Sequence, residues 1–157
     1  MDKCNGITTP MEQLPLQNND SAAFPDTQHY CQSVSGSLMH AMLGTRPDLA
    51  YTVFTLSKFN INPGDRHIMA AKRALRYLQH TSTFGITYGG AGKHRNVTVF
   101  SDADWGNDKD TRRSVYGFVF LINGGAVSWK SKRQTVVALS STEAEYVGYS
   151  EAAKEAI

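Results

Sequence analysis

The amino-acid sequence predicts an α/β chain in two parts: a helical first part, then three strands, the last two of them joined as a hairpin, followed by a helix. Three features support this prediction. Apolar residues recur at spacings of three and four over 65–80, Asn123-Gly124 separates two strand-like segments, and Ser140 precedes Glu143 by three positions where a helical pattern begins. These are the signatures of an amphipathic helix, a hairpin with a two-residue turn, and a helix N-terminus.

The composition is that of a soluble globular chain. Of its 157 residues, 41% are hydrophobic and 19% are charged, which excludes the disordered class. The formal net charge of +2 is too small to indicate nucleic-acid binding by itself. No apolar run is long enough for a membrane span, and the first residues lack the apolar segment of a secretory signal. We therefore expect an intracellular protein, cytoplasmic or nuclear, with no membrane partner.

The first part is expected to be a lead-in followed by helices. Residues 1–32 are rich in Pro, Asn, Gln and Thr without clear periodicity, which predicts an extended or poorly ordered segment. A helix is predicted from Thr45, as its N-cap, to about Phe59. A second helix is predicted over 65–80, and residues 81–88 are strand-like. These helices make residues 33–88 a separate, mostly helical segment.

The second part begins after a glycine-rich linker. Residues 89–95 combine several glycines with basic residues, which marks a domain boundary. Strands are predicted over 97–100, 114–122 and 126–130, and a last helix opens at Ser140. No stop signal precedes Ile157, so the helix is expected to continue beyond it. Residues 96–157 form this second segment.

Acidic residues gather where the first strand of the second part ends. Asp102 and Asp104 follow this strand, although aspartate is uncommon in strands, and Glu145 lies in the first turns of the last helix. Carboxylate oxygens are the natural ligands of Mg²⁺, so Asp102 and Glu145 facing one another would form a metal site. The alternative is a solvated acidic loop. An EF-hand is excluded, because its sixth and twelfth positions counted from Asp102 hold Asn107 and Arg113.

Several ungapped motifs follow one another along the chain. They are residues 36–39 (GSLM), 45–48 (TRPD), 73–78 (RALRYL), 101–106 (SDADWG), 112–118 (RRSVYGF), 128–134 (SWKSKRQ) and 138–146 (ALSSTEAEY). In this order they resemble a copia-type LTR-retrotransposon Pol polyprotein, from the end of its reverse transcriptase into the first half of its ribonuclease H domain. The resemblance covers nearly the whole chain, and motifs in series are far more specific than any one alone.

The resemblance implies a fold, a reaction and a cofactor. The fold is a truncated ribonuclease H-like mixed sheet, with three antiparallel strands and then a helix, after a reverse-transcriptase connection segment. The reaction is cleavage of the RNA strand of an RNA–DNA hybrid, with two Mg²⁺ or Mn²⁺ ions held by four carboxylates. Asp102 and Glu145 match the first-strand aspartate and the helix glutamate of the family, whereas Asp104 and Glu143 do not.

The family's other two carboxylates would follow Ile157. By this resemblance the isolated chain is expected to be catalytically incomplete and to hold no metal stably. Its partners would be the RNA–DNA hybrid and the remainder of the Pol polyprotein. Two alternatives remain open: a non-catalytic remnant that binds nucleic acid, and a degenerate gene fragment.

Two basic groups are candidates for nucleic-acid binding. The first lies on one side of the helix over 65–80, away from its apolar side, and consists of Arg66, Arg73 and Arg76. The second follows the third strand and consists of Lys130, Lys132 and Arg133. Phosphate contact is one interpretation of each group, and a solvated surface is the other. Trp105 and Trp129 flank strands, so we expect them in the core rather than stacked on bases.

Overall fold

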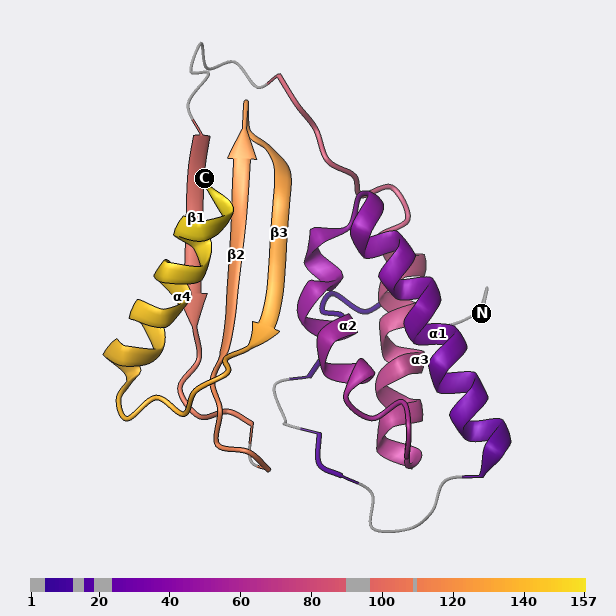
Figure 1. Ribbon diagram of the computed structural model, residues 1–157. Helices are drawn as coiled ribbons and strands as arrows, with labels where there is room; N and C mark the ends of the chain where they lie inside the picture. The colour runs from indigo at the N-terminus through magenta and orange to yellow at the C-terminus, as the bar shows by residue number, and fades with distance from the viewer. Residues whose placement is uncertain (1–4, 13–15, 19–23, 90–96, 109) are drawn as a thin grey trace. The chain divides into compact units, whose positions relative to one another are not determined.

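The computed structural model describes residues 5–12, 16–18, 24–89, 97–108 and 110–157 (Figure 1). The chain divides into two compact units, Met1–Gly85 and Ile86–Ile157. The first contains helices and the second an antiparallel sheet with a helix, which confirms the predicted α/β class. The division falls slightly before the predicted linker, of which residues 90–95 lie outside the described ranges. None of the described helices is long and apolar enough to cross a membrane.

The first unit contains α1 (Pro25–Gly44), the short 3-10 helix η1 (Pro47–Leu49), α2 (Ala50–Ser57) and α3 (Asp65–His80). α1 packs against α2, η1 and α3. The buried core consists of Val34, Leu38, Leu49, Val53, Leu56, Ala71, Ala74 and Tyr77. The core residues of α3 recur every three positions, in agreement with the apolar periodicity that predicted this helix.

Three local predictions between residues 25 and 88 are wrong. α1 begins at Pro25, so residues 25–32 are helical rather than an extended lead-in. Thr45 follows α1 as its C-cap instead of preceding a helix as an N-cap. Pro47 then opens η1, where its missing N–H costs no helical hydrogen bond. Residues 81–88 form turns and irregular backbone rather than a strand.

α3 begins at Asp65, as predicted, and His67 supports this start. The backbone N–H of Gly64 donates to Nδ1 of His67 at 2.8 Å. The imidazole is buried and stacks on the Phe59 ring, with 4.2 Å between ring centres. Nδ1 accepts a hydrogen bond only in the neutral imidazole, and burial favours that form by lowering the pKa of His67. His67 therefore has a structural role at the start of α3.

The second unit contains β1 (Val97–Ala103), β2 (Val115–Ile122), β3 (Gly125–Arg133) and α4 (Ser141–Glu155). The strands form an antiparallel sheet in the order β1-β2-β3. In the β2–β3 turn, Asn123 and Gly124 have φ angles of 50° and 79°. Positive φ at both positions is typical of a type I′ turn, which Asn-Gly favours. The predicted hairpin is therefore confirmed, and so is the helix after Ser140.

α4 packs on one face of this sheet, alongside β1 and β2 (Figure 1). The core between them consists of Tyr116, Phe118, Phe120 and Ala152, with Ala103 packed against it. Gly148 makes the close approach of α4, because a Cβ placed on it would lie 3.5 Å from the Cβ atoms of Ala103 and Tyr116. Since side chains alternate along a strand, these contacts determine which residues of β1 point toward α4.

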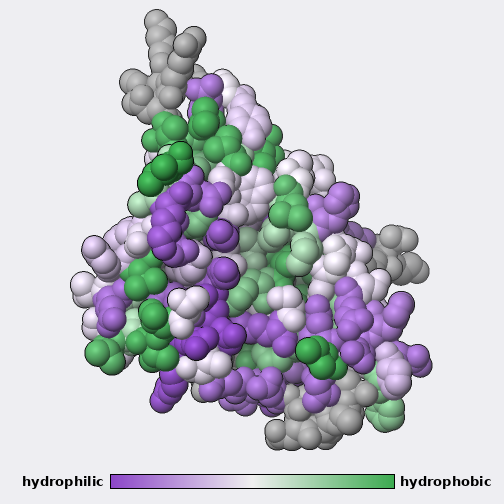
Figure 2. All heavy atoms as spheres, viewed as in Figure 1, coloured by the Kyte–Doolittle hydropathy of each residue, from purple (hydrophilic) through white to green (hydrophobic). Residues whose placement is uncertain are grey.

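Hydrophobic side chains also remain at the surface. Figure 2 shows hydrophobic residues (green) among hydrophilic ones (purple) on the visible face. In the second unit the exposed large hydrophobic residues include Val97, Phe100, Trp105, Leu139 and Tyr146. Trp105 is 60% exposed, so its assignment to the core is wrong, whereas Trp129 is partly buried. Exposed apolar residues are common on protein surfaces and do not by themselves indicate a binding site.

Candidate functional site

Two of the four carboxylates near β1 and α4 have structural roles. Asp104 Oδ1 accepts a hydrogen bond from the backbone N–H of Val115 at 2.5 Å, and the Asp104 N–H donates to the Val115 carbonyl at 3.0 Å. Asp104 thus closes the connection between β1 and β2. Glu143 Oε2 accepts from the backbone N–H of Leu139 at 2.7 Å, and Ser140 Oγ accepts from the N–H of Glu143 at 3.1 Å. Glu143 and Ser140 therefore cap the start of α4.

Asp102 and Glu145 are the other two carboxylates. Asp102 lies in β1 opposite Gly117, and Glu145 lies in the first turns of α4. Both are exposed, and neither has a hydrogen bond or ion pair with any residue that the structure describes. The oxygens of the two residues assigned to metal binding are thus unengaged, unlike those of their neighbours in the same motifs.

Strand alternation places the side chain of Asp102 on the face of β1 away from α4. Ser101 Oγ and Ala103 Cβ lie 3.6 Å and 3.5 Å from the position of a Cβ on Gly148, so both side chains point toward α4. Asp102, between them, therefore points to the face of the sheet away from α4. Glu145 precedes Gly148 by less than one helical turn, so both carboxylates lie near the same end of β1. Alternation along β1 thus places Asp102 on the other face from Ser101 and Ala103, and the expectation that its carboxylate faces that of Glu145 stays a prediction.

The described residues do not by themselves fit a metal ion. Across these ranges, no group of three or more His, Cys, Asp and Glu side chains is placed to hold one. Mg²⁺ requires near-octahedral oxygen ligands and keeps its waters when protein ligands are few. Asp102 or Glu145 would therefore act as a metal ligand only together with further oxygen ligands.

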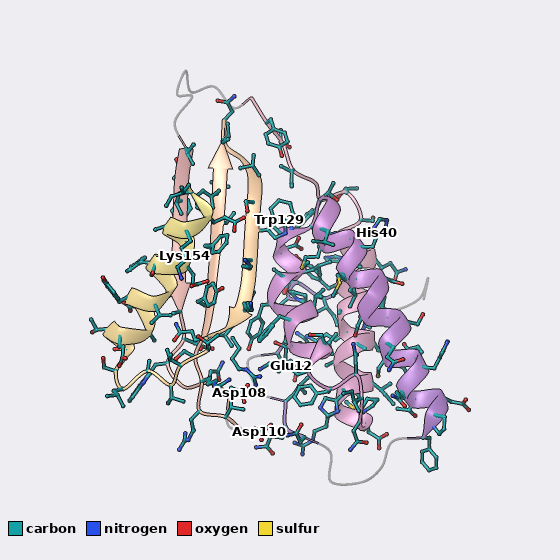
Figure 3. The ribbon with its side chains drawn as sticks, viewed as in Figure 1. Glu12, His40, Asp108, Asp110, Trp129 and Lys154 are labelled. Carbon is teal, nitrogen blue, oxygen red and sulfur yellow. The ribbon has the colours of Figure 1, made fainter. Side chains whose placement is uncertain are left out.

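Asp108 organises the connection between β1 and β2 (Figure 3). Its Oδ1 accepts from the backbone N–H groups of Asp110 and Thr111, each at 3.2 Å. Its Oδ2 accepts from Nη1 of Arg133 at 3.1 Å, and the Asp108 side chain is only 6% exposed. The acidic connection is therefore a hydrogen-bonded turn rather than a solvated run of charge.

Two of the three basic residues in the group at 130–133 are engaged within the second unit. Lys130 Nζ lies 3.9 Å from Glu155 Oε2 and 5.8 Å from the centre of the Phe118 ring. Arg133 is held by Asp108, as described above. Lys132 is exposed and has no ion pair within the described ranges. Lys132 is thus the member of this group that remains open to a phosphate.

The arginines of α3 form the second candidate surface. Arg73 Nη1 donates to Glu12 Oε1 at 2.9 Å, and Arg76 Nη2 donates to the Asn5 carbonyl at 2.8 Å. Arg66 is exposed and has no partner in the part of the chain that is described. Two of the three predicted phosphate contacts are therefore occupied by residues that precede α1. No sequence motif indicated this contact, because Glu12 and Arg73 are far apart in the chain.

Comparison with known proteins finds relatives over most of the chain. It is 51% identical over 125 residues to the secreted RxLR effector protein 161 of Plasmopara viticola, covering 80% of this chain and 87% of that protein. It is 46% identical over 125 residues to the retrovirus-related Pol polyprotein from transposon TNT 1-94 of Nicotiana tabacum. It is 40% identical over 141 residues to the corresponding polyprotein from transposon RE1 of Arabidopsis thaliana. Most of this chain is therefore homologous to a segment of retrovirus-related transposon Pol polyproteins.

The chain corresponds to a small segment of these Pol polyproteins. The alignments cover 80% and 89% of this chain but only 9% of the tobacco polyprotein and 9% of the Arabidopsis polyprotein. No protein-family model matches the chain, and no solved structure matches it. Homology to Pol polyproteins therefore extends over most of the chain, and the activity of the whole polyprotein is a separate question.

In this Pol segment, two further residues hold the start of α4 in place. Gln134 is buried, and its Nε2 donates to the carbonyl of Ala144 at 2.7 Å. Trp105 Nε1 donates to the carbonyl of Ala138 at 3.1 Å. Both contacts lie close in sequence to Glu145. The sequence did not assign these roles, although both residues lie within recognised motifs.

Proposed function

We propose that this Pol segment joins a reverse-transcriptase connection (residues 33–88) to the first half of a copia-type ribonuclease H-like domain (residues 96–157). The observation that carries the proposal is which carboxylates of the second unit accept hydrogen bonds and which do not. Three antiparallel strands precede α4, and the carboxylates of Asp102 and Glu145 have no partner among the described residues. Those of Asp104 and Glu143 hold backbone N–H groups. The family motifs point to the same two unengaged residues.

The parent polyprotein would degrade the RNA strand of RNA–DNA hybrids during reverse transcription. In such a hydrolysis a water oxygen bonds to phosphorus as a P–O bond of the RNA backbone breaks. The family uses Mg²⁺ or Mn²⁺ for this reaction. Asp102 and Glu145 are proposed as part of the ligand set only, because they do not form a metal site with the other described residues. We therefore expect the isolated chain to be catalytically incomplete.

The proposed partners are the RNA–DNA hybrid and the remainder of the Pol polyprotein. Within the two predicted basic groups, the residues available to phosphates are Arg66 and Lys132, together with Arg73 and Arg76 if their present contacts open. Phosphate contacts of this kind make affinity fall steeply with salt. An intracellular location, cytoplasmic or nuclear, goes with this function.

Hybrid cleavage by the purified chain tests the proposal. A labelled RNA–DNA hybrid is incubated with Mg²⁺ and then Mn²⁺, with the chain alone and with the polypeptide that follows the matched segment in the tobacco Pol polyprotein. The expected result is no cleavage alone and cleavage by the mixture, which Asp102→Asn abolishes and Asp104→Asn reduces less. Cleavage by neither sample, with hybrid binding intact, would favour a non-catalytic binding remnant. Equal losses from the two aspartate variants would overturn the choice of Asp102.

A second candidate function follows from the coverage of the Plasmopara relative. This chain covers 87% of that protein, whose name describes it as a secreted effector. A secreted protein with the same two units would not need nuclease activity. A secretion assay of the full chain in its own cells separates the candidates, because export without hybrid binding favours the effector and intracellular retention with hybrid binding favours the Pol function.

A further inference from the structure

A short segment before α1 lies along the arginine-bearing side of α3. We call residues 5–12 the arm. Its oxygens accept hydrogen bonds from two arginines: Arg73 donates to Glu12 at 2.9 Å and to Thr9 Oγ1 at 3.0 Å, and Arg76 donates to the Asn5 carbonyl at 2.8 Å. Figure 3 labels Glu12 on this arm. All these contacts pair a guanidinium with an oxygen of the arm.

The arm is also packed at both of its ends. At one end, Gly6 lies against the ring of His80, and a Cβ placed on Gly6 would require that ring to shift. At the other end, Met11 packs on the buried core of the first unit. The arm therefore follows α3 from its C-terminal end toward its middle.

We propose that the arginine side of α3 is a binding surface for nucleic-acid phosphates and that the arm is its internal occupant, displaced when the nucleic acid binds. This inference rests on the proposed function, because it names the surface by which the Pol segment holds the hybrid. The chemistry of the contacts supports it. A carboxylate, a hydroxyl and a carbonyl oxygen occupy guanidinium donors that phosphate oxygens also bind, often with two parallel hydrogen bonds.

The arm satisfies these arginines incompletely. The Nε atoms of Arg73 and Arg76 are buried and have no hydrogen-bond partner among the described residues. The Glu12 side chain is 61% exposed, and ion pairs that are so accessible to solvent contribute little. A polyanion that meets several arginines gains additional free energy by releasing counterions. Displacement of the arm by a nucleic acid is therefore favourable on electrostatic grounds.

A cavity lies beside the Arg73–Glu12 ion pair, and we expect a phosphate to bind there first. The cavity has a volume of about 300 Å³ and is lined by Met11, Glu12, Leu16, Arg66, Met69, Ala70 and Arg73. Arg66 is exposed and unpartnered among the described residues, and it shares this cavity with Arg73. A phosphate bound first at Arg66 would therefore stand close to the Arg73–Glu12 pair and compete with the carboxylate.

Binding of an RNA–DNA hybrid by the full chain tests the arm. Glu12→Gln removes its charge but keeps its shape, and Asp26→Asn in α1 is the matched control with the same change in net charge. We expect Glu12→Gln to tighten hybrid binding by about two- to fivefold at low salt, the range that an exposed ion pair allows. Asp26→Asn should change affinity less. In the background of Arg73→Gln, the effect of Glu12→Gln should disappear.

The outcomes separate the inference from the proposed function. If Glu12→Gln and Asp26→Asn change the affinity for the hybrid equally, the arm is not the occupant of the arginine side of α3, although the chain still binds the hybrid. No hybrid binding by any variant, with all variants folded by circular dichroism, would contradict the proposed function itself. Faster amide exchange in residues 5–12 on addition of hybrid is the direct sign of displacement, and unchanged exchange alongside tight binding would overturn it.

Discussion

Arg46 donates two hydrogen bonds to the carboxylate of Asp48: Nη2 lies 2.7 Å from Oδ2, and Nε lies 3.0 Å from Oδ1. The Arg46 side chain is only 7% exposed, and it also donates to the carbonyl and the hydroxyl of Thr81. The hydroxyl of Tyr77 donates to Asp48 Oδ2 at 2.7 Å. The pair therefore joins the turn before η1 to the end of α3, which gives residues of the TRPD motif a structural role.

Replacing Arg46 should destabilise the first unit. Arg46→Ala leaves a partly buried carboxylate and the carbonyl of Thr81 without their donors, so we expect a loss of about 3 kcal/mol in the free energy of unfolding. Urea unfolding followed by far-UV circular dichroism measures it, because most of the helix lies in the first unit. Arg66→Ala, an exposed arginine in the same unit, should cost less than about 0.5 kcal/mol. Equal losses would contradict a structural role for the Arg46–Asp48 pair.

Acid should weaken the same cluster. Burial opposes ionisation of Asp48, but hydrogen bonds from Arg46 and Tyr77 outweigh it and lower its pKa. A lowered pKa in the folded state contributes stability above the unfolded value, near 3.9, and this stability is lost as the pH falls through the folded pKa. Thermal unfolding between pH 5 and pH 2 should therefore show a decline that Asp48→Asn makes shallower. An equally steep decline in both proteins would mean that groups other than Asp48 cause the loss of stability in acid.

Alkali should weaken the second unit through Tyr116. Burial, and then the carboxylate of Glu151 at 3.3 Å from the hydroxyl, raise the pKa of Tyr116 to about 12. Between pH 10 and this value the unfolded chain loses the proton while the folded chain keeps it, so stability falls as the pH rises. The slope should approach about 1.4 kcal/mol per pH unit. Both tryptophans lie in the second unit, so their fluorescence follows its unfolding, and Tyr116→Phe should remove this slope.

A methyl group should be tolerated at Gly148. Its Cβ would meet Ala103 and Tyr116 at 3.5 Å, which is ordinary van der Waals contact. Alanine favours a helix over glycine by about 1 kcal/mol, so Gly148→Ala should stabilise the second unit by up to that amount. Gly36→Ala in α1 is the matched control, because a Cβ there meets nothing within 4 Å. A loss of stability at Gly148 with a gain at Gly36 would show that α4 cannot move to accept the methyl group.

The sequence predicts correctly those helices and turns whose defining residues lie close together in the chain. The helix over 65–80 and the Asn123-Gly124 hairpin are examples. The start of α1 was missed, although its buried residues Cys31, Val34, Ser35 and Leu38 follow helical spacing. Ser35 interrupts the apolar pattern, and it is buried because its hydroxyl bonds to Asn60 Oδ1 at 3.0 Å. Residues 81–88 have strand-like side chains, but propensity alone gives no partner strand.

The candidate site depended on contacts between distant residues, which local patterns do not contain. Asp104 accepts its hydrogen bond from the backbone N–H of Val115, which lies eleven positions later in the sequence and is brought beside it by the fold. The arm contact joins Glu12 to Arg73 across 61 positions. The orientation of Asp102 away from α4 follows from strand alternation once α4 is known to lie on the Ser101 and Ala103 side. Periodicity places residues on a face but does not say which face the next element covers.

The two aspartates of the SDADWG motif should separate into one that supports the fold and one that does not. Asp104→Ala removes the acceptor for the Val115 N–H at the start of β2, and we expect a loss of about 1–2 kcal/mol from the second unit. Asp102→Ala removes an exposed carboxylate without a described partner, so stability should change by less than about 0.5 kcal/mol. Urea unfolding followed by tryptophan fluorescence compares the two variants with the unchanged chain. A neutral Asp102→Ala would leave metal or substrate contact as the remaining reason for an aspartate in a strand, since aspartate is depleted there. A loss at Asp102 equal to that at Asp104 would instead assign Asp102 to the fold and remove the structural ground for placing it in the site.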